Sequence, residues 1–219
     1  MNTFYTRGNT LTTGPATAPV TAAQLRTYLR ETATGLPDTE ADDFIDEARQ
    51  LIEDYSGLAL ITQTWQLTID RWPSAHEPWW VGVRQAHINI MEGGHSSLRL
   101  PRFPLQSITS VKTYSGDGTA TTVVVADTFD VDTEQTPGRI TLKVGGTWPV
   151  ALRANNAIEV VYKSGYGDAA SDVPKPLIRA VKQLAAYLYS HRGDDCVDGS
   201  PLMKSGVASI LNTYRVRAI

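Results

Sequence analysis

The chain has 219 residues, of which 42% are hydrophobic, and this suits one domain, or one and a half, with a substantial core. Its formal net charge is -3 and its lysines and arginines are scattered, which excludes an electrostatic footprint for wrapping nucleic acid. The single cysteine, Cys196, excludes an internal disulfide, and no apolar run reaches the length of about 18 residues that spans a membrane. The N-terminus lacks the apolar stretch of a secretion signal, so we expect none.

The first part of the chain is predicted to be a polar arm followed by two helices. Residues 1–20 are rich in threonine, glycine and proline, which favours either a disordered tail or an arm that orders on a neighbouring subunit. Thr21 is a suitable N-cap for a short helix over 21–31. A longer helix is expected over 38–56, with apolar residues at helical spacing, Gly57 as its stop and its carboxylates on the solvent side.

Residues 61–163 are predicted to form an antiparallel, β-rich insertion, because polar and apolar residues alternate in several short runs. The Gly116-Asp117-Gly118 sequence between two such runs is typical of a hairpin turn. Residues 71–97 do not follow this alternation, and their structure stays open between a hairpin strand and a long extension.

A proline-rich segment lies at the centre of this insertion. Pro101 and Pro104 fix the backbone and remove two hydrogen-bond donors, so the segment cannot be a helix or the middle of a sheet. We predict a rigid corner between two strands, with Leu100, Phe103 and Leu105 as core anchors.

The last part of the chain is predicted to be helical again, over 174–191 and 201–214. The expected fold class is therefore α+β: a small helical bundle of about four helices with an inserted antiparallel β-rich part and a flexible N-terminal arm. Residues 1–20 would be the arm, and residues 21–219 a single domain.

No pattern of residues predicts catalysis, and we expect no catalytic residue, no cofactor and no metal. Gly165-Tyr166-Gly167 lacks the third glycine of a phosphate-binding loop and favours a tight turn. Cys196 follows His191 closely, but a surface thiol explains it better than a Cys–His nucleophile. Two further sets lack the spacing of metal ligands: His76, His87 and His95, and Asp194, Asp195 and Asp198.

Aromatic and apolar residues outside the predicted core are candidate contact residues, since exposed aromatics concentrate at protein interfaces. Trp79 and Trp80 lie in the 71–97 segment, where core or hairpin packing explains them equally well. The tail from Arg215 to Ile219 alternates basic and apolar residues. Such a tail favours docking in an extended form along another chain, with a frayed terminus as the alternative.

Several short motifs, taken in order, resemble the head–tail connector (adaptor) proteins of long-tailed bacteriophages and gene transfer agents. The resemblance covers about residues 20–192, and a longer N-terminal arm and the large 71–97 insertion depart from the pattern. The motifs include EDYSG at 53–57, TQTW at 62–65, LPRFPL at 100–105, SVKTY at 110–114, VYKSGYG at 161–167 and LYSHR at 188–192.

The resemblance implies a structural virion protein without enzymatic activity, made in the host cytoplasm and located in the virion neck between the capsid portal and the tail. Members of the family form a ring, typically twelve-fold, beneath the portal protein. The ring extends the DNA channel and provides the docking surface for the tail-side stopper or tail terminator protein. DNA would pass through the lumen without sequence-specific binding, and no membrane would be involved.

The resemblance also assigns a candidate interface within this chain. The C-terminal segment would contact the portal through Tyr214, Arg215, Val216, Arg217 and Ile219. Independently of the resemblance, the arm and the insertion contain apolar groups that a lone domain would have difficulty burying. These groups are the candidate subunit or tail-side interface: Phe4, Tyr5, Leu11, Trp79 and Trp80. The alternative function is a phage tail-associated carbohydrate-binding module or small hydrolase, which only the aromatic-rich insertion favours.

Overall fold

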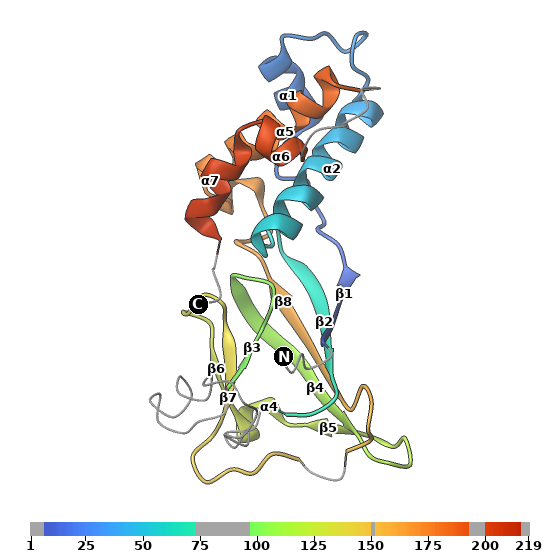
Figure 1. Ribbon diagram of the computed structural model, residues 1–219, viewed down its shortest axis with the longest axis vertical. Helices are drawn as coiled ribbons and strands as arrows, with labels where there is room; N and C mark the ends of the chain where they lie inside the picture. Colours follow the sequence, from blue (N-terminus) through green and yellow to red (C-terminus); the bar gives the residue numbers. More distant parts are fainter. Residues whose placement is uncertain (1–6, 73–96, 150–151, 193–199, 216–219) are drawn as a thin grey trace, which may run out of the picture. The chain divides into compact units, whose positions relative to one another are not determined.

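The structure, a computed structural model, describes residues 7–72, 97–149, 152–192 and 200–215 (Figure 1). Its contacts divide the chain into two compact units, which we call the β unit (within 1–13 and 64–164) and the helical unit (within 14–63 and 165–219). The chain leaves the helical unit after Gln63 and returns to it at Gly165. Helices and antiparallel sheets together confirm the α+β class.

The helical unit is made of helices that begin and end at the signals visible in the sequence. Thr21 caps the first helix, where its Oγ1 accepts a hydrogen bond from the Gln24 amide at 3.3 Å. Gly57 ends the second helix in a left-handed conformation with φ 80°. The elements are α1 (Ala22–Leu29), α2 (Asp38–Ser56), the 3-10 turn η1 (Ala170–Asp172), α5 (Lys175–Ser190), α6 (Pro201–Lys204) and α7 (Val207–Tyr214).

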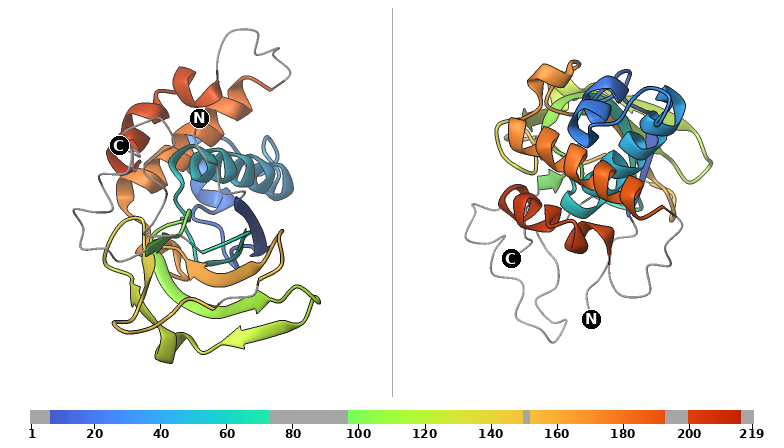
Figure 2. Two further views of the ribbon diagram at one scale, coloured as in Figure 1. Left: turned by 60° about the horizontal axis from the view of Figure 1, so that its bottom comes forward. Right: turned by 90° about the horizontal axis from the view of Figure 1, so that it is seen from above.

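Helices α2 and α5 form the centre of the helical unit. Their apolar faces pack on each other, and both α1 and α7 contact this pair (Figure 2, right). The pair is antiparallel, because Phe44 near the start of α2 meets Tyr189 near the end of α5, with ring centroids 5.8 Å apart. The fully buried residues of the two faces include Ile45, Ala48 and Ile52 on α2 and Leu177, Val181 and Leu184 on α5.

The C-terminal helical segment differs from the expected single helix over 201–214. It is divided into α6 and α7 at Ser205 and Gly206, and Gly206 has a left-handed φ of 76°. The Gln183 side chain of α5 donates a hydrogen bond to the Ser205 carbonyl and so fixes this turn. The break lets α6 and α7 contact α5 separately.

Truncation of Leu184 should strongly destabilise the helical unit. Leu184 is fully buried, so Leu184→Ala removes buried methyl groups and leaves a cavity, at a cost of about 2–5 kcal/mol. Leu51 shares the apolar stripe of α2 but is only half-buried, so Leu51→Ala is the matched control and should cost clearly less. Urea denaturation of both variants measures the difference, and equal losses would contradict this assignment of helix faces.

The β unit contains two antiparallel sheets. The five-stranded sheet has the order β1-β2-β8-β4-β5, and the three-stranded sheet has the order β3-β7-β6. Its elements are β1 (Arg7–Thr13), β2 (Gln63–Ile69), β3 (Ser97–Arg99), β4 (Leu105–Tyr114), β5 (Ala120–Val123), the short helix α4 (Val125–Thr128), β6 (Phe129–Asp132), β7 (Arg139–Leu142) and β8 (Ile158–Ser164).

The N-terminal strand β1 lies within the segment expected to be a flexible arm. It pairs antiparallel with β2, with Leu11 opposite Trp65. Residues 7–13 are therefore not a flexible arm, because their backbone groups form hydrogen bonds with β2 of the same chain. Residues 1–6 lie outside the described residues.

The predicted proline corner is confirmed. It connects β3 of the three-stranded sheet to β4 of the five-stranded sheet, and Leu100, Phe103 and Leu105 are all buried. The chain passes close to Gly138 here, because a Cβ at Gly138 would lie 2.4 Å from the Cβ of Leu105. The corner therefore places Leu100 and Leu105 in the hydrophobic core of the β unit.

The predicted hairpin turn between β4 and β5 is also present. Asp117 accepts hydrogen bonds from the Ser115 hydroxyl and, at 3.0 Å, from the Thr119 amide. These bonds, that of the Ser115 hydroxyl first, lower the pKa of the Asp117 carboxyl to about 2. Gly118 has φ 87°, a conformation that glycine adopts without strain.

Candidate functional site

The candidate site is the surface around the end of α7, where the chain continues into the predicted portal-binding tail. Five residues of the helical unit make up what we call the C-terminal patch: Tyr55, Tyr166, Asn212, Tyr214 and Arg215. Tyr55 contacts Asn212 and Arg215 directly, and Tyr166 is linked to Tyr214 by an electrostatic interaction. The five residues come from α2, from the turn after β8, and from α7 with its C-cap.

Contacts between α7 and α2 fix the base of the tail. The Tyr55 hydroxyl donates a hydrogen bond to Asn212 Oδ1 at 3.3 Å. The Arg215 guanidinium lies over the Tyr55 ring, 4.9 Å from its centroid, a distance that permits a cation–π interaction. The Arg215 amide donates to the Leu211 carbonyl at 2.9 Å and closes the last turn of α7. These contacts therefore hold the end of α7 and Arg215 beside Tyr55.

Tyr166 is held in place by the turn that the Gly165-Tyr166-Gly167 sequence forms. The Tyr166 amide donates to the Leu60 carbonyl at 3.3 Å, and the Thr62 amide donates to the Gly167 carbonyl at 2.9 Å. Gly165 has φ 142°, and a Cβ there would lie 2.6 Å from the backbone of Ile61, so only glycine fits. Burial raises the pKa of the Tyr166 hydroxyl, and the nearby Tyr214 adds to the rise.

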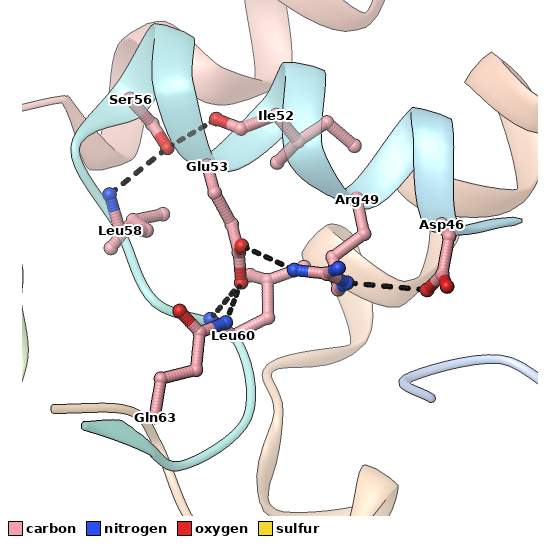
Figure 3. A network of polar contacts seen from close by, with 8 residues as sticks. All are labelled: Asp46, Arg49, Ile52, Glu53, Ser56, Leu58, Leu60 and Gln63. Atoms are coloured by element: carbon pink, nitrogen blue, oxygen red, sulfur yellow. Dashed lines mark hydrogen bonds and ion pairs between the residues drawn. The ribbon is translucent and has the colours of Figure 1, made fainter. Parts of the chain in front are cut away.

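A buried polar network joins the end of α2 to the segment that holds this turn (Figure 3). Glu53 is its centre and accepts three hydrogen bonds: from Arg49 Nη1 at 2.7 Å, from the Leu60 amide at 2.9 Å and from Gln63 Nε2 at 2.7 Å. The expectation that the carboxylates of this helix lie on its solvent side is therefore wrong for Glu53. Its burial is possible because a cation and two neutral donors surround it.

Two further contacts extend the network along α2. Arg49 Nε also lies 3.5 Å from Asp46 Oδ1, at the more exposed end. Ser56 Oγ donates to the Ile52 carbonyl at 2.6 Å and accepts from the Leu58 amide at 3.3 Å. The segment 58–63, which contacts the turn around Tyr166, is thus fixed to α2 by side-chain hydrogen bonds.

The chemistry of the C-terminal patch suits protein contact. Tyrosine provides a large contact area with few rotatable bonds, and arginine provides several directional hydrogen-bond donors. Both residue types are enriched at interface centres. Within the described ranges, no group of three histidine, cysteine, aspartate or glutamate side chains is placed to hold a metal ion. No helix among the described residues is long and apolar enough to cross a bilayer.

The structure brings together part of the predicted portal interface. Tyr214 and Arg215 lie in the C-terminal patch, whereas Val216, Arg217 and Ile219 lie outside the described residues. Of the other predicted interface, Leu11 lies on β1 with 41% of its surface exposed. Its remaining members lie outside the described residues: Phe4, Tyr5, Trp79 and Trp80.

Three residues of the patch were not predicted as site residues: Tyr55, Tyr166 and Asn212. Tyr55 belongs to the apolar stripe of a helix, and this pattern gives no indication that its hydroxyl meets a residue far along the chain. Of the three, only Tyr166 could have been identified from the sequence. It lies between two glycines in a predicted tight turn, and such a turn exposes the side chain between its glycines.

The chain is similar to solved structures of gene transfer agent (GTA) particles over nearly its whole length. It matches a chain in the neck of an empty GTA particle computed with C6 symmetry, with 21% identity, 97% coverage of both chains and a TM-score of 0.72. A chain in the virion of a native GTA particle gives 20% identity, coverage of 96% and 97%, and a TM-score of 0.71. A chain in the neck of a native GTA particle computed with C12 symmetry gives 22% identity, coverage of 96% of this chain and 97% of that chain, and a TM-score of 0.67.

No protein-family model matches the sequence, and no curated protein matches it. The similarity to the GTA structures establishes that this chain shares their fold over nearly its whole length.

Proposed function

We propose that this protein is a structural component of a virion neck, a head–tail adaptor that forms a ring beneath the portal. The observation that carries the proposal is the shared fold with chains of GTA necks and virions, which covers nearly all of both chains. The order of sequence motifs supports it independently, since these motifs resemble the adaptor proteins of long-tailed phages. The protein acts by assembly and not by catalysis.

The proposed ring extends the DNA channel from the portal and offers the next neck protein, a stopper or tail terminator, its docking surface. A twelve-fold ring agrees with the C12 and C6 symmetries used for the similar particles. A subunit with a net charge of -3 has no strongly basic surface on which passing DNA would be retained, because non-specific binding depends on clustered cations.

The C-terminal patch and the tail that follows it form the proposed portal contact. Arg215 and Tyr214 begin this contact from a rigid base, since Tyr55 and Asn212 hold the end of α7. The rest of the tail extends along the portal, with backbone hydrogen bonds for affinity and alternate side chains for specificity. Leu11 and the other predicted residues of the N-terminal and insertion segments form the subunit or tail-side contact.

The proposal is tested by mixing the purified full-length protein with the portal protein of the same particle. We expect rings stacked on the portal in negative-stain micrographs, with twelve-fold class averages. A parallel glycan array covers the carbohydrate-binding alternative. If the protein stays monomeric, does not bind the portal and binds a glycan, the carbohydrate-binding function would replace the proposed neck function.

A further inference from the structure

Opposite sides of the helical unit carry opposite charge. Residues 14–63 contain nine acidic and three basic side chains, whereas residues 165–219 contain five acidic and seven basic ones. The acidic residues are concentrated on α2, and the first half of α5 carries three cations. The first half of α2 is therefore negatively charged, and the first half of α5 is positively charged.

Two exposed carboxylates of α2 lie on the side of the helix that is opposite its apolar stripe. Asp43 and Glu47 are four residues apart and exposed, on the side of the helix opposite the buried Ile45, Ala48 and Ile52. Neither carboxylate has a basic partner within the described part of the chain. We call these two residues, with the neighbouring Glu40, the acidic face.

The charged residues of α5 lie on the face that points away from α2. Lys175, Arg179 and Lys182 recur at intervals of four and three residues, opposite the buried Leu177 and Leu184. None of the three has an acidic partner among the described residues. We call them the basic face. Because α2 and α5 pack through their apolar sides, with α1 and α7 contacting both, the acidic and basic faces lie on opposite sides of the helical unit.

The stability of α5 does not explain the basic face. The N-terminus of a helix carries partial positive charge, so Lys175 in the first turn of α5 is unfavourable there, and the nearby Arg179 gains nothing from it. The acidic residues of α2 extend beyond its first turn, where the helix dipole no longer stabilises them. Both sets therefore fit an electrostatic partner outside the helix better than a local role.

We propose that the acidic face of one copy docks against the basic face of the next copy in the ring. This inference rests on the proposed function, since a closed ring repeats one heterologous contact in which two different surfaces of each subunit meet. Two unpaired faces of opposite sign on opposite sides of one unit meet that requirement. Complementary charge also speeds the encounter of copies and opposes contacts between like faces.

The test uses charge reversal on each face of the full-length protein. The acidic-face variant is Asp43→Lys with Glu47→Lys, and the basic-face variant is Lys175→Glu with Arg179→Glu. All four residues are exposed, so both variants should fold, which circular dichroism and melting curves verify. Ring formation on the portal is counted in micrographs at physiological ionic strength. A control variant, Asp127→Lys with Asp130→Lys, makes the same charge change as the acidic-face variant, on exposed residues of the β unit.

We expect each single-face variant to lose its rings, because identical charges then meet at every contact, while the control keeps them. Two combinations should restore rings. One is the chain that carries both reversals, in which the signs are exchanged but remain complementary. The other is an equimolar mixture of the two single-face variants, which can alternate around a ring with an even number of subunits.

The outcomes separate this inference from the proposed function. Rings from both single-face variants at the wild-type level would overturn the docking of these faces and leave the adaptor assignment in place. Loss of rings in the control variant as well would also overturn it, since net charge and not these faces would then decide assembly. Absence of rings from the wild-type protein on the portal would overturn the adaptor assignment itself, and this inference with it.

Discussion

Deletion of residues 215–219 should leave the protein folded and abolish its attachment to the portal. The deletion removes Arg215, whose guanidinium lies over Tyr55, and the residues beyond it. An exposed cation–π contact contributes about 0.5–1 kcal/mol, so the melting temperature should fall by a few degrees at most. Among the residues that the structure describes, Leu211 is the last fully buried one, and it precedes the deletion.

Particles from the deletion mutant show whether the tail binds the portal. We expect DNA-filled heads without tails, because the neck would not assemble on the capsid. Arg215→Ala is the matched control: it removes the same contact with Tyr55 but keeps the backbone and the apolar residues of the tail. We expect it to produce tailed particles in reduced number. Normal tailed particles from the deletion mutant would show that the portal contact lies elsewhere.

Substitution of Glu53 should have the largest effect on stability. Glu53 and Arg49 are both buried, and their carboxylate and guanidinium are 2.7 Å apart. Glu53→Gln keeps the shape but leaves the Arg49 charge without its counter-charge in a buried site. Removal of one partner of a buried ion pair costs about 3–5 kcal/mol. The segment that holds the turn at Tyr166 should loosen in the same variant, since Glu53 also binds the Leu60 amide.

Urea denaturation of the purified protein measures this effect, with Asp46→Asn as the control. Asp46 also lies near Arg49, but its side chain is 59% exposed, and surface ion pairs contribute about 0–1 kcal/mol. The double variant Arg49→Met with Glu53→Leu removes both charges together and should recover much of the loss. If Glu53→Gln cost no more than Asp46→Asn, the buried network would have no major part in stability.

Local chemistry made much of the fold predictable. Thr21 and Gly57 mark helix ends because capping and the left-handed stop depend on neighbouring residues. The alternation in β2 predicts its buried face, since successive side chains of a strand point to opposite sides. The proline corner follows from Pro101 and Pro104, which permit few backbone conformations.

Of the candidate site, only the C-terminal tail could be predicted from the sequence. The alternation of residues 215–219 indicates a docking tail, because the pattern lies within the tail itself. The base of that tail depends on Tyr55 and Asn212, which are 157 residues apart in sequence and have no shared pattern. Such a pairing arises when α2 and α7 pack together, so only the tertiary structure contains it.

The sequence by itself determined where the main helices and strands form, because caps, prolines and periodicity act over a few residues. The tertiary structure decided whether a polar segment is an arm or a strand, since β1 requires β2, more than 50 residues away, as its partner. It also decided that Glu53 is buried while Glu47, on the same helix, is exposed. Burial of a carboxylate depends on whether a cation and amide donors converge on it, and packing of distant segments brings them there.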